Sequence, residues 1–426
     1  MATSGDRANL EHADVIVIGG GVIGLACAWY LLLAGRSVRL IEQRHIGNGS
    51  SFGNSGLITP SMAAPLPAPG MLRKLPRWLL DPDAPVYIKP RLDFAFIAWA
   101  RQFAGACNEA AMLRAMRARH ALLESSRHLL DAFISSEDVD CDWEPSGLYV
   151  VYKSESHLRE GDALDQWLEE LGIEVHHIDG PALRVAEPAL RDDMVGARFY
   201  PGDARLRPDR LLTEWLDRVI TRGVKIDEDC EVRGFSAEAD RITSLVTSRG
   251  NLTADDYVLA TGAWSPQFGR RLGLRLPIQP GKGYSVTMRR PAICPSHPLV
   301  LKERLISMTP WASGFRIGGT MEFAGYDTSM NRRRIDAMFD AARSYLADPL
   351  DDTVVEPWYG WRPMTPDGVP LIGRSYRHRN LFVASGHNML GVSMSAGTGR
   401  LIAELVTSAD PHIDPAPYAL ERFRPG

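Results

Sequence analysis

The order of apolar and polar positions predicts a βαβ unit near the start of the chain. Asp14–Ile18 is a short apolar run rich in β-branched residues, which is typical of a parallel strand buried on both faces. Glycines follow it, and an apolar helix is predicted at Val22–Leu33, with Gly35 as its stop. Ser37–Ile41 then predicts a second strand. This strand–helix–strand order indicates an α/β domain.

Proline and the hydrophobic period divide the rest of the chain. Residues 60–90 are rich in proline, which lacks a backbone donor, so irregular structure is expected there. Helical patterns follow at 92–135 and 156–172, with a strand at 148–153 between them. A last helix is predicted at 395–407. Other short strands are predicted at 224–226, 231–235, 242–248, 257–261, 285–288, 315–318 and 381–384.

Length and composition narrow the class of protein. The chain has 426 residues, more than the roughly 250–300 at which a single core stops growing, so two domains are expected. It is 45% hydrophobic and 23% charged, which is ordinary for a soluble globular protein. The net charge of −4 gives no indication of a nucleic-acid partner.

The cysteines and the N-terminal residues bear on compartment. The 5 cysteines are scattered without a CxxC pair, so neither a disulfide framework nor a metal site is predicted, and a reducing compartment is favoured. Residues 1–12 lack the apolar core of a signal peptide, and no apolar run reaches the roughly 18 residues needed for a membrane span. We therefore expect a cytoplasmic location, with peripheral attachment to an inner membrane as the alternative.

A glycine motif joins the first strand to the first helix. Residues 19–24 read GGGVIG and match GxGxxG, and Glu42 ends the second strand about 20 residues later. Gly19 allows the tight turn, Gly21 lets the backbone approach a pyrophosphate, and Gly24 lets the helix pack on the strand. The helix N-terminus would bind phosphate and Glu42 a ribose, which disfavours NADP but does not separate NAD from FAD. The alternative is a glycine turn that binds nothing.

A small-residue loop at 48–57 (NGSSFGNSGL) suggests which dinucleotide is bound. It resembles the flavin-contacting loop of the D-amino-acid oxidase (DAO) superfamily of FAD-dependent oxidoreductases. Residues 51–56 and 66–89 are most similar to segments of the bacterial D-amino-acid dehydrogenases. Four more segments resemble family motifs in the expected order: 203–211, 260–265, 360–373 and 386–401.

The resemblance implies an α/β fold with two domains. One is a Rossmann-like FAD-binding domain, and the other is an α+β substrate domain built on a mixed antiparallel sheet. The implied FAD-binding domain is discontinuous and comprises residues 1–140, 199–272 and 359–426. The implied substrate domain comprises residues 141–198 and 273–358.

The resemblance also implies the residues that bind FAD. Val232 would contact the adenine through its backbone, and the N–H groups of 391–394 would stabilise charge on the reduced flavin, unless they form an ordinary helix cap. Relatives that bind the flavin covalently use a Trp-His pair or a cysteine, but this chain has Phe52 and Gly53 at the first position and no cysteine after Arg362, so non-covalent FAD is expected. The expected contacts are Gly19, Gly21, Val22, Ile23, Gly24, Glu42, Gln43, Ser50, Ser51, Asn54, Ser55, Gly56, Leu57, Val232, Thr261, Gly262, Trp264, Gly386, Asn388, Met389, Leu390, Gly391, Val392 and Ser393.

Three residues are candidates for the chemistry. Arg362, in a segment similar to the family's arginine motif, would bind the substrate carboxylate, because guanidinium pairs with carboxylate through two parallel hydrogen bonds. Tyr284 would bind the same carboxylate or close the site, with a core tyrosine as the alternative. His387 would lie in the active site, with a structural histidine as the alternative. No general base is required if hydride passes directly from Cα to the flavin.

The resemblance implies oxidative deamination of a D-amino acid in amino-acid catabolism, with electrons passed to a quinone or another carrier. An oxidase or dehydrogenase of a secondary amine or imino acid, such as hydroxyproline, proline, glycine or sarcosine, is the alternative. A third hypothesis is a flavin-binding subunit without activity of its own. The segment around Trp78 and Leu79 would then touch a membrane, a quinone or a partner subunit, or else pack as an ordinary loop.

Overall fold

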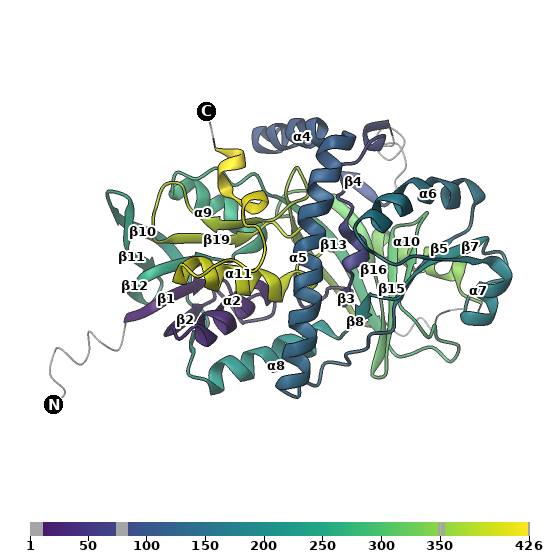
Figure 1. Ribbon diagram of the computed structural model, residues 1–426, viewed down its shortest axis with the longest axis horizontal. Coiled ribbons are helices and arrows are strands. Elements are labelled where there is room, and N and C mark those ends of the chain that lie inside the picture. Colours follow the sequence, from purple (N-terminus) through teal and green to yellow (C-terminus); the bar gives the residue numbers. More distant parts are fainter. Residues whose placement is uncertain (1–11, 74–83, 348–349, 351–353, 425–426) are drawn as a thin grey trace.

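The computed structural model describes residues 12–73, 84–347, 350 and 354–424. Figure 1 shows two sheets side by side, with the long helix α5 (Glu109–Ser136) crossing between them. The predicted segment around Trp78 and Leu79 lies outside the described residues. Within the described ranges, no helix has both the length and the apolar character needed for a membrane span.

The first sheet contains both strands of the predicted βαβ unit. Its strand order is β10-β11-β12-β1-β2-β9, with β19 paired to β12 and β18 paired to β19. β1 runs parallel to both β12 and β2, and β19 runs parallel to β12. The strands are β1 (His12–Ile18), β2 (Val38–Ile41), β9 (Lys225–Asp227), β10 (Val232–Glu238), β11 (Arg241–Thr247), β12 (Gly250–Leu259), β18 (Leu371–Arg374) and β19 (Leu381–Ser385).

Both faces of β1 are buried, which explains why its sequence is continuously apolar. Val15 and Val17 pack with the helices, while Ile16 and Ile18 belong to the core on the opposite side of the sheet. Residues of α5 join the same helical core. The other helices of this half are α2 (Val22–Leu33), α8 (Pro208–Thr221), α9 (Ser265–Arg271) and α11 (Ser395–Thr407).

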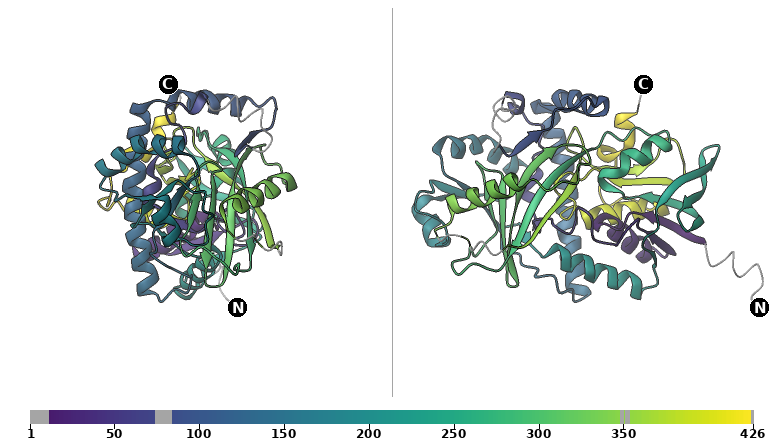
Figure 2. Two further views of the ribbon diagram at one scale, coloured as in Figure 1. Left: turned by 90° about the vertical axis from the view of Figure 1, so that its right-hand side faces the viewer. Right: turned by 180° about the vertical axis from the view of Figure 1, so that it is seen from behind.

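The second sheet is mixed and mostly antiparallel. Its order is β17-β13-β16-β15-β14-β5-β7-β6, and β4 pairs with β16. Figure 2 shows this sheet from two further sides. The strands are β4 (Val86–Ile88), β5 (Leu148–Tyr152), β6 (His176–Asp179), β7 (Gly196–Tyr200), β13 (Gln279–Met288), β14 (Leu299–Leu301), β15 (Ile306–Trp311), β16 (Gly314–Phe323) and β17 (Val354–Met364). The helices of this half are α4 (Phe94–Ala106), α6 (Glu155–Glu170), α7 (Gly180–Ala186) and α10 (Arg332–Tyr345).

One face of the second sheet packs against α10, and the other faces the first half of the molecule. Ile335 and Met338 of α10 lie in one core with Tyr284 and Val286 of β13. Since side chains alternate along a strand, Gly283 and Ser285 belong to the opposite face. We call this opposite face the site face. The small remaining elements are β3 (Leu57–Ile58), β8 (Ala204–Arg205), η1 (Pro60–Ala63), η2 (Gly262–Trp264), η3 (Ala416–Tyr418) and η4 (Leu420–Phe423).

The predicted fold class, an α/β fold with a second mixed sheet, is confirmed. The helix predicted at 22–33 has those bounds in the structure. The helical patterns predicted at 92–135 form two helices, because Asn108 caps the start of α5 and separates it from α4. β4 forms within the proline-rich stretch that was expected to be irregular. The structure places β4 and all of β17 in the second sheet, whereas the implied boundaries put 86–88 and 359–364 in the FAD-binding domain.

Candidate active site

The glycine turn after β1 has the geometry that a dinucleotide needs. Gly19 has φ +108°, and a Cβ there would lie 2.7 Å from the carbonyl oxygen of Ala260. A Cβ on Gly24 would lie 1.8 Å from the carbonyl oxygen of Gly19, so both positions require glycine. The N-cap residue of α2 supplies no capping side chain. Val22 donates its N–H to Ser51 Oγ at 3.1 Å, so the loop at 50–57 lies against the start of this helix.

Glu42 connects the glycine turn to the far end of the sheet. Its carboxylate accepts a hydrogen bond from the N–H of Gly20 at 2.9 Å. Its own carbonyl accepts from the N–H of Cys230 at 2.8 Å, two residues before Val232 begins β10. Gln43 is exposed. Glu42 and Val232 therefore lie near each other, as one adenosine-binding end would require.

The carboxyl ends of β12 and β19 are joined by hydroxyl groups. Thr261 Oγ1 and Ser265 Oγ are 3.0 Å apart, and Ser265 Oγ donates to Ser385 Oγ at 2.8 Å. Ser385 Oγ also donates to the carbonyl of Gly262 at 2.9 Å. The ring of Trp264 is 5.5 Å from that of Trp361, next to the predicted substrate arginine. Ligands of open α/β sheets bind at this carboxyl edge.

The last predicted flavin turn is bound to the arginine strand by Asn388. The Asn388 N–H donates to the carbonyl of Pro363 at 3.1 Å, and its Oδ1 accepts from the N–H of Thr365 at 3.1 Å. Asn388 has φ +54°, a conformation that asparagine tolerates better than most residues. Ser393 Oγ donates to the carbonyl of Leu57 at 2.8 Å. Residues 391–394 form a turn that precedes α11, which begins at Ser395.

The other predicted residues of this turn differ in exposure. Gly386 is buried with φ +82°, and Val392 is also buried. Met389 is 42% exposed, and Leu390 is partly buried against the helical core. The turn therefore has one side in the protein and one side open.

The loop at 50–57 rests on the site face of the second sheet. Ser50 Oγ donates to the carbonyl of Trp361 at 2.5 Å, and Ser55 Oγ is 2.7 Å from Ser307 Oγ. Asn54 Oδ1 accepts from the N–H of Gly56 at 2.8 Å. The predicted cofactor residues Ser50, Asn54 and Ser55 thus use their side chains within the protein. The backbone of Asn54 is bonded as well, its N–H to the carbonyl of Ser51 and its carbonyl to Arg316, whereas the N–H of Ser55 has no acceptor among the described residues.

Arg362 is a guanidinium without a counter-charge among the residues that the structure describes. Its Nη1 donates to the carbonyl of Thr320 at 2.6 Å, and its Nη2 to the carbonyl of Gly319 at 3.3 Å. Within the described residues, no carboxylate lies within ion-pair distance of it, and part of the side chain remains accessible. Burial lowers the pKa of Arg362 to about 10, so the group stays charged at neutral pH.

Local backbone geometry places this guanidinium. A register shift between β13 and β16 forms an irregularity between Lys282 and Tyr284, and Thr320 there has φ +58°, which is costly for a β-branched residue. The carbonyls of Gly319 and Thr320 are the two that accept from Arg362. A Cβ on Gly283 would lie 2.0 Å from Arg362 Nη1, so only glycine leaves room for the guanidinium.

The structure corrects the predicted role of Tyr284. The Tyr284 hydroxyl donates to Glu322 Oε2 at 2.8 Å, and the side chain is 1% exposed in the core under α10. Burial and the neighbouring Glu322 raise the pKa of Tyr284. Tyr284 therefore lies on the face opposite Arg362, because a strand turns successive side chains to opposite sides. The core-tyrosine alternative fits this placement.

His387 is likewise held within the protein. Its Nε2 is 3.0 Å from Thr398 Oγ1 of α11, and the residue is buried. Burial lowers the pKa of His387 to about 3, so the imidazole is neutral near pH 7. No contact between His387 and Arg362 is found in the described part of the chain. The structure thus brings neither Tyr284 nor His387 to Arg362.

Several residues of the site face were missed from the sequence. Gly283 and Ser285 are two residues apart on β13, so both belong to this face. Ser307 of β15 belongs to the same surface. A Cβ built on the neighbouring Gly318 would lie 3.5 Å from Ser307 Oγ and 3.7 Å from Ser285 Cβ. The signal for Gly283 and Ser285 was the alternation of small residues in GKGYS at 281–285. Arg316 of β16, which contacts the loop at 50–57, carried no local signal.

The residues present fit a flavin dinucleotide. The glycine turn has no space for side chains at Gly19 or Gly24, and the start of α2 has no side-chain cap from its N-cap residue. On the site face, Ser285 Oγ and Thr309 Oγ1 are buried without a hydrogen-bond partner among the described residues. The same is true of Trp361 Nε1. Buried polar atoms without partners are uncommon in folded proteins and are consistent with a polar ligand.

Comparison with known proteins identifies the family. The family model described as "FAD dependent oxidoreductase" (DAO) matches residues 14–405. The chain therefore belongs to the DAO family of FAD-dependent oxidoreductases. It is 34% identical to the D-amino acid dehydrogenase of Granulibacter bethesdensis, over 96% of this chain and 99% of the relative. It is 33% identical to the D-amino acid dehydrogenase of Xanthobacter autotrophicus, over 96% and 99% of the two chains.

Solved structures show the same fold. Glycine oxidase from Geobacillus kaustophilus superposes with a TM-score of 0.78 at 23% identity, covering 97% of this chain and 100% of that one. L-proline dehydrogenase from P. horikoshii superposes with a TM-score of 0.76 at 20% identity, covering 97% of this chain and 98% of that one. The protein is thus an FAD-dependent oxidoreductase by its family.

Proposed function

We propose that this protein catalyses oxidative deamination of a D-amino acid to the 2-oxo acid and ammonia. The observation that carries the proposal is Arg362, a charged guanidinium with no carboxylate partner among the described residues. A buried cation of this kind is stabilised by an anionic ligand, and a substrate carboxylate supplies one. The names of the relatives in Granulibacter and Xanthobacter support D-amino acids as the substrate class.

In this proposal, Arg362 binds and orients the substrate, and it is the catalytic residue of the chain. Its two carbonyl partners hold the guanidinium in place, and its remaining N–H groups bind the carboxylate. Ser285 offers a buried hydroxyl on the same face. Tyr284 is not assigned a substrate contact, because its hydroxyl is bonded to Glu322.

The chemistry that FAD supplies when bound is acceptance of hydride from the substrate Cα. The imine that remains is hydrolysed by water, so the chain needs no strong general base. Its own residues hold the Cα–H bond in a fixed orientation and limit the access of water. The neutral His387 supports the fold of the last turn rather than proton transfer.

We further propose that FAD is bound non-covalently and that its electrons pass to a quinone or another carrier. The residues expected to hold FAD are those around the glycine turn, the loop at 50–57, the end of β12 and the last turn. The five free cysteines, Cys27, Cys107, Cys141, Cys230 and Cys294, include none in those segments, which supports the non-covalent mode. Acid precipitation that releases all the flavin into solution would verify it.

The function is tested by anaerobic mixing of the purified yellow protein with single amino acids. D-amino acids are expected to bleach the oxidised flavin absorbance within turnover times, while their L-enantiomers do not. Bleaching by sarcosine or proline alone would instead identify a secondary-amine enzyme and refute the proposal. Subsequent exposure to oxygen or to a soluble quinone analogue then identifies the acceptor, since rapid reoxidation by oxygen alone would mark an oxidase.

A further inference from the structure

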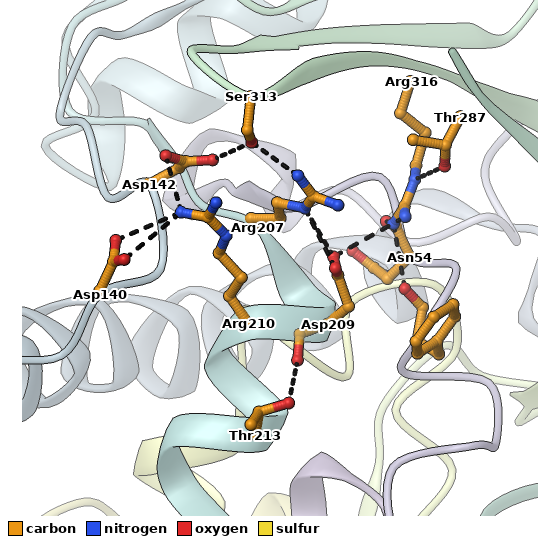
Figure 3. Close-up of polar contacts among 11 residues, drawn as sticks. Asn54, Asp140, Asp142, Arg207, Asp209, Arg210, Thr213, Thr287, Ser313 and Arg316 are labelled. Carbon is orange, nitrogen blue, oxygen red and sulfur yellow. Dashed lines mark hydrogen bonds and ion pairs between the residues drawn. The ribbon is translucent and has the colours of Figure 1, made fainter. Parts of the chain in front are cut away.

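The loop at 50–57 is held from behind by a buried arginine of the other sheet. Arg316 of β16 is 2% exposed. Its Nη1 donates to the carbonyls of Phe52 at 3.0 Å and Asn54 at 2.6 Å. Its Nε donates to Thr287 Oγ1 of the neighbouring strand β13 at 2.9 Å. Figure 3 shows this guanidinium between Thr287 and Asn54.

These two hydrogen bonds orient two peptide groups of the loop. In a planar trans peptide, the carbonyl and the following N–H point in opposite directions. Because the carbonyls of Phe52 and Asn54 point at Arg316, the N–H groups of Gly53 and Ser55 point away from it. In the part of the chain that the structure describes, neither N–H has an acceptor. Two aligned donors are thus left on the side of the loop away from Arg316.

The charge of Arg316 is only partly balanced. Its Nη2 is 3.9 Å from Asp209 Oδ1, at the first turn of α8. Asp209 is shared with Arg207, whose Nε is 3.1 Å from Asp209 Oδ2. Figure 3 shows Asp209 between the two arginines. Among the charged groups of this cluster, Arg316 is the one that contacts the loop, so its positive charge lies directly behind the loop, where low solvent exposure reduces screening.

We propose that Arg316 is a positioning residue for the flavin: it sets the direction of the Gly53 and Ser55 N–H groups and places positive charge behind the loop that contacts the isoalloxazine. This inference rests on the flavin site of the proposed function and is independent of its substrate. Positive charge and N–H donors beside a flavin stabilise its reduced, negatively charged form and raise its reduction potential. Arg316 therefore acts through the loop and not on the substrate.

The test compares Arg316→Met and Arg316→Lys with Asp209→Asn. Each variant is measured for its FAD dissociation constant, by quenching of flavin fluorescence on titrating the apoprotein. The flavin reduction potential is measured against reference dyes. Neither readout needs an amino-acid substrate, so the result stands even if D-amino acids fail to reduce the wild-type protein.

Arg316→Met is expected to weaken FAD binding about 10- to 100-fold, because two charge-assisted hydrogen bonds to the loop are lost. It is also expected to lower the reduction potential. Asp209→Asn removes the compensating negative charge and is expected to raise the potential. Arg316→Lys keeps the charge but loses the planar fork of the guanidinium. Its FAD affinity and its reduction potential should therefore lie between those of the wild type and of Arg316→Met.

Arg198→Met is the matched control. Arg198 is 3% exposed on β7 of the same sheet, and it pairs with Asp165 at 2.6 Å instead of contacting the loop. This variant should lower the melting temperature and leave the FAD dissociation constant within about 2-fold.

Two results would overturn the inference. One is a folded Arg316→Met protein whose FAD affinity and potential match those of the wild type. The other is a shift of the potential in the same direction for Arg316→Met and Asp209→Asn, since a general loosening of the loop would do this and a charge effect would not. If Arg316→Met does not fold, Arg316→Lys and Asp209→Asn carry the test, and an unchanged potential in both would refute it.

Discussion

Two arginines at opposite ends of the site face look alike and differ in what balances their charge. Each donates to two backbone carbonyls, and burial lowers the pKa of each to about 10. Arg362 lies beside Gly283 and Arg316 beside Thr287, about 13 Å further along β13. Arg316 is buried and has Asp209 within 3.9 Å, whereas Arg362 is partly accessible and has no carboxylate partner in the described ranges.

The difference separates a structural clamp from a ligand-binding group. A buried charge whose donors are bonded within the protein and which has a carboxylate nearby, even one shared with a second arginine, holds its neighbours in place. A charge with carbonyl partners alone is positioned but not neutralised, which leaves it ready for an anion. Backbone contacts by themselves would not have distinguished the two arginines.

The largest expected difference between the two arginines is in the effect of their substitution on turnover. Arg362→Met keeps the length of the side chain and removes the charge, so kcat/KM for a D-amino acid should fall about 1000-fold or more. FAD affinity, measured by fluorescence titration, should stay within about 2-fold. Arg362→Lys should recover only part of the loss, because an ammonium cannot pair with both carboxylate oxygens through a planar fork. Wild-type kcat/KM in Arg362→Met would refute the assignment.

A smaller effect is expected when the space for the guanidinium is removed. Gly283→Ala puts a methyl group 2.0 Å from Arg362 Nη1, so the guanidinium must move away from its carbonyl partners. KM should rise about 10- to 100-fold, with a lesser change in kcat. Gly234→Ala is the matched strand control, since its Cβ would meet nothing closer than 3.8 Å. Equal effects of the two substitutions would contradict the prediction.

The two arginines should also differ in stability. Arg316→Met leaves the carbonyls of Phe52 and Asn54 and the carboxylate of Asp209 short of a partner, so the free energy of unfolding should fall by about 2–3 kcal/mol. Arg362→Met removes an uncompensated charge and should change it by less than about 1 kcal/mol, or increase it. Urea unfolding of the apoproteins measures this without the contribution of bound FAD. A larger loss for Arg362→Met would break the comparison.

A buried carboxyl group tests the premise that an unpaired charge costs stability. Asp203 is 1% exposed and bonded to Ser61, and burial raises its pKa to about 7. Because the folded-state pKa lies above that of the unfolded chain, the free energy of unfolding should fall as pH rises from about 4 to about 7. Asp203→Asn should remove this decrease and gain on the order of 1 kcal/mol at pH 8.

Thermal unfolding at pH 5, 6, 7 and 8 measures the effect of Asp203→Asn. The difference in melting temperature between Asp203→Asn and the wild type should grow as pH rises to about 7 and then level off. A gain that is the same at all four values would show that Asp203 does not titrate in this range.

Local sequence patterns predicted many of the residues proposed for the flavin site. The need for glycine at Gly19 and Gly24 is a property of one turn and one helix contact, so the motif and Glu42 were recognisable in the sequence. Tyr284 shows where such patterns fail, because the segment GKGYS marks a strand near the site without stating which of its two faces is turned inward. The small residue Gly283 was the one facing Arg362, and Ser285 lies further along the same face of β13.

The sequence by itself determined the α/β architecture with a second mixed sheet and the glycine turn after β1, and it marked Arg362 as the candidate substrate arginine, because each depends on motifs of residues close together along the chain. The tertiary structure decided which face of β13 meets the site, that Arg316 supports the loop at 50–57, and that no carboxylate of the described ranges pairs with Arg362. These features depend on strand pairing and on contacts between residues hundreds of positions apart. Such contacts form only when the two sheets pack together.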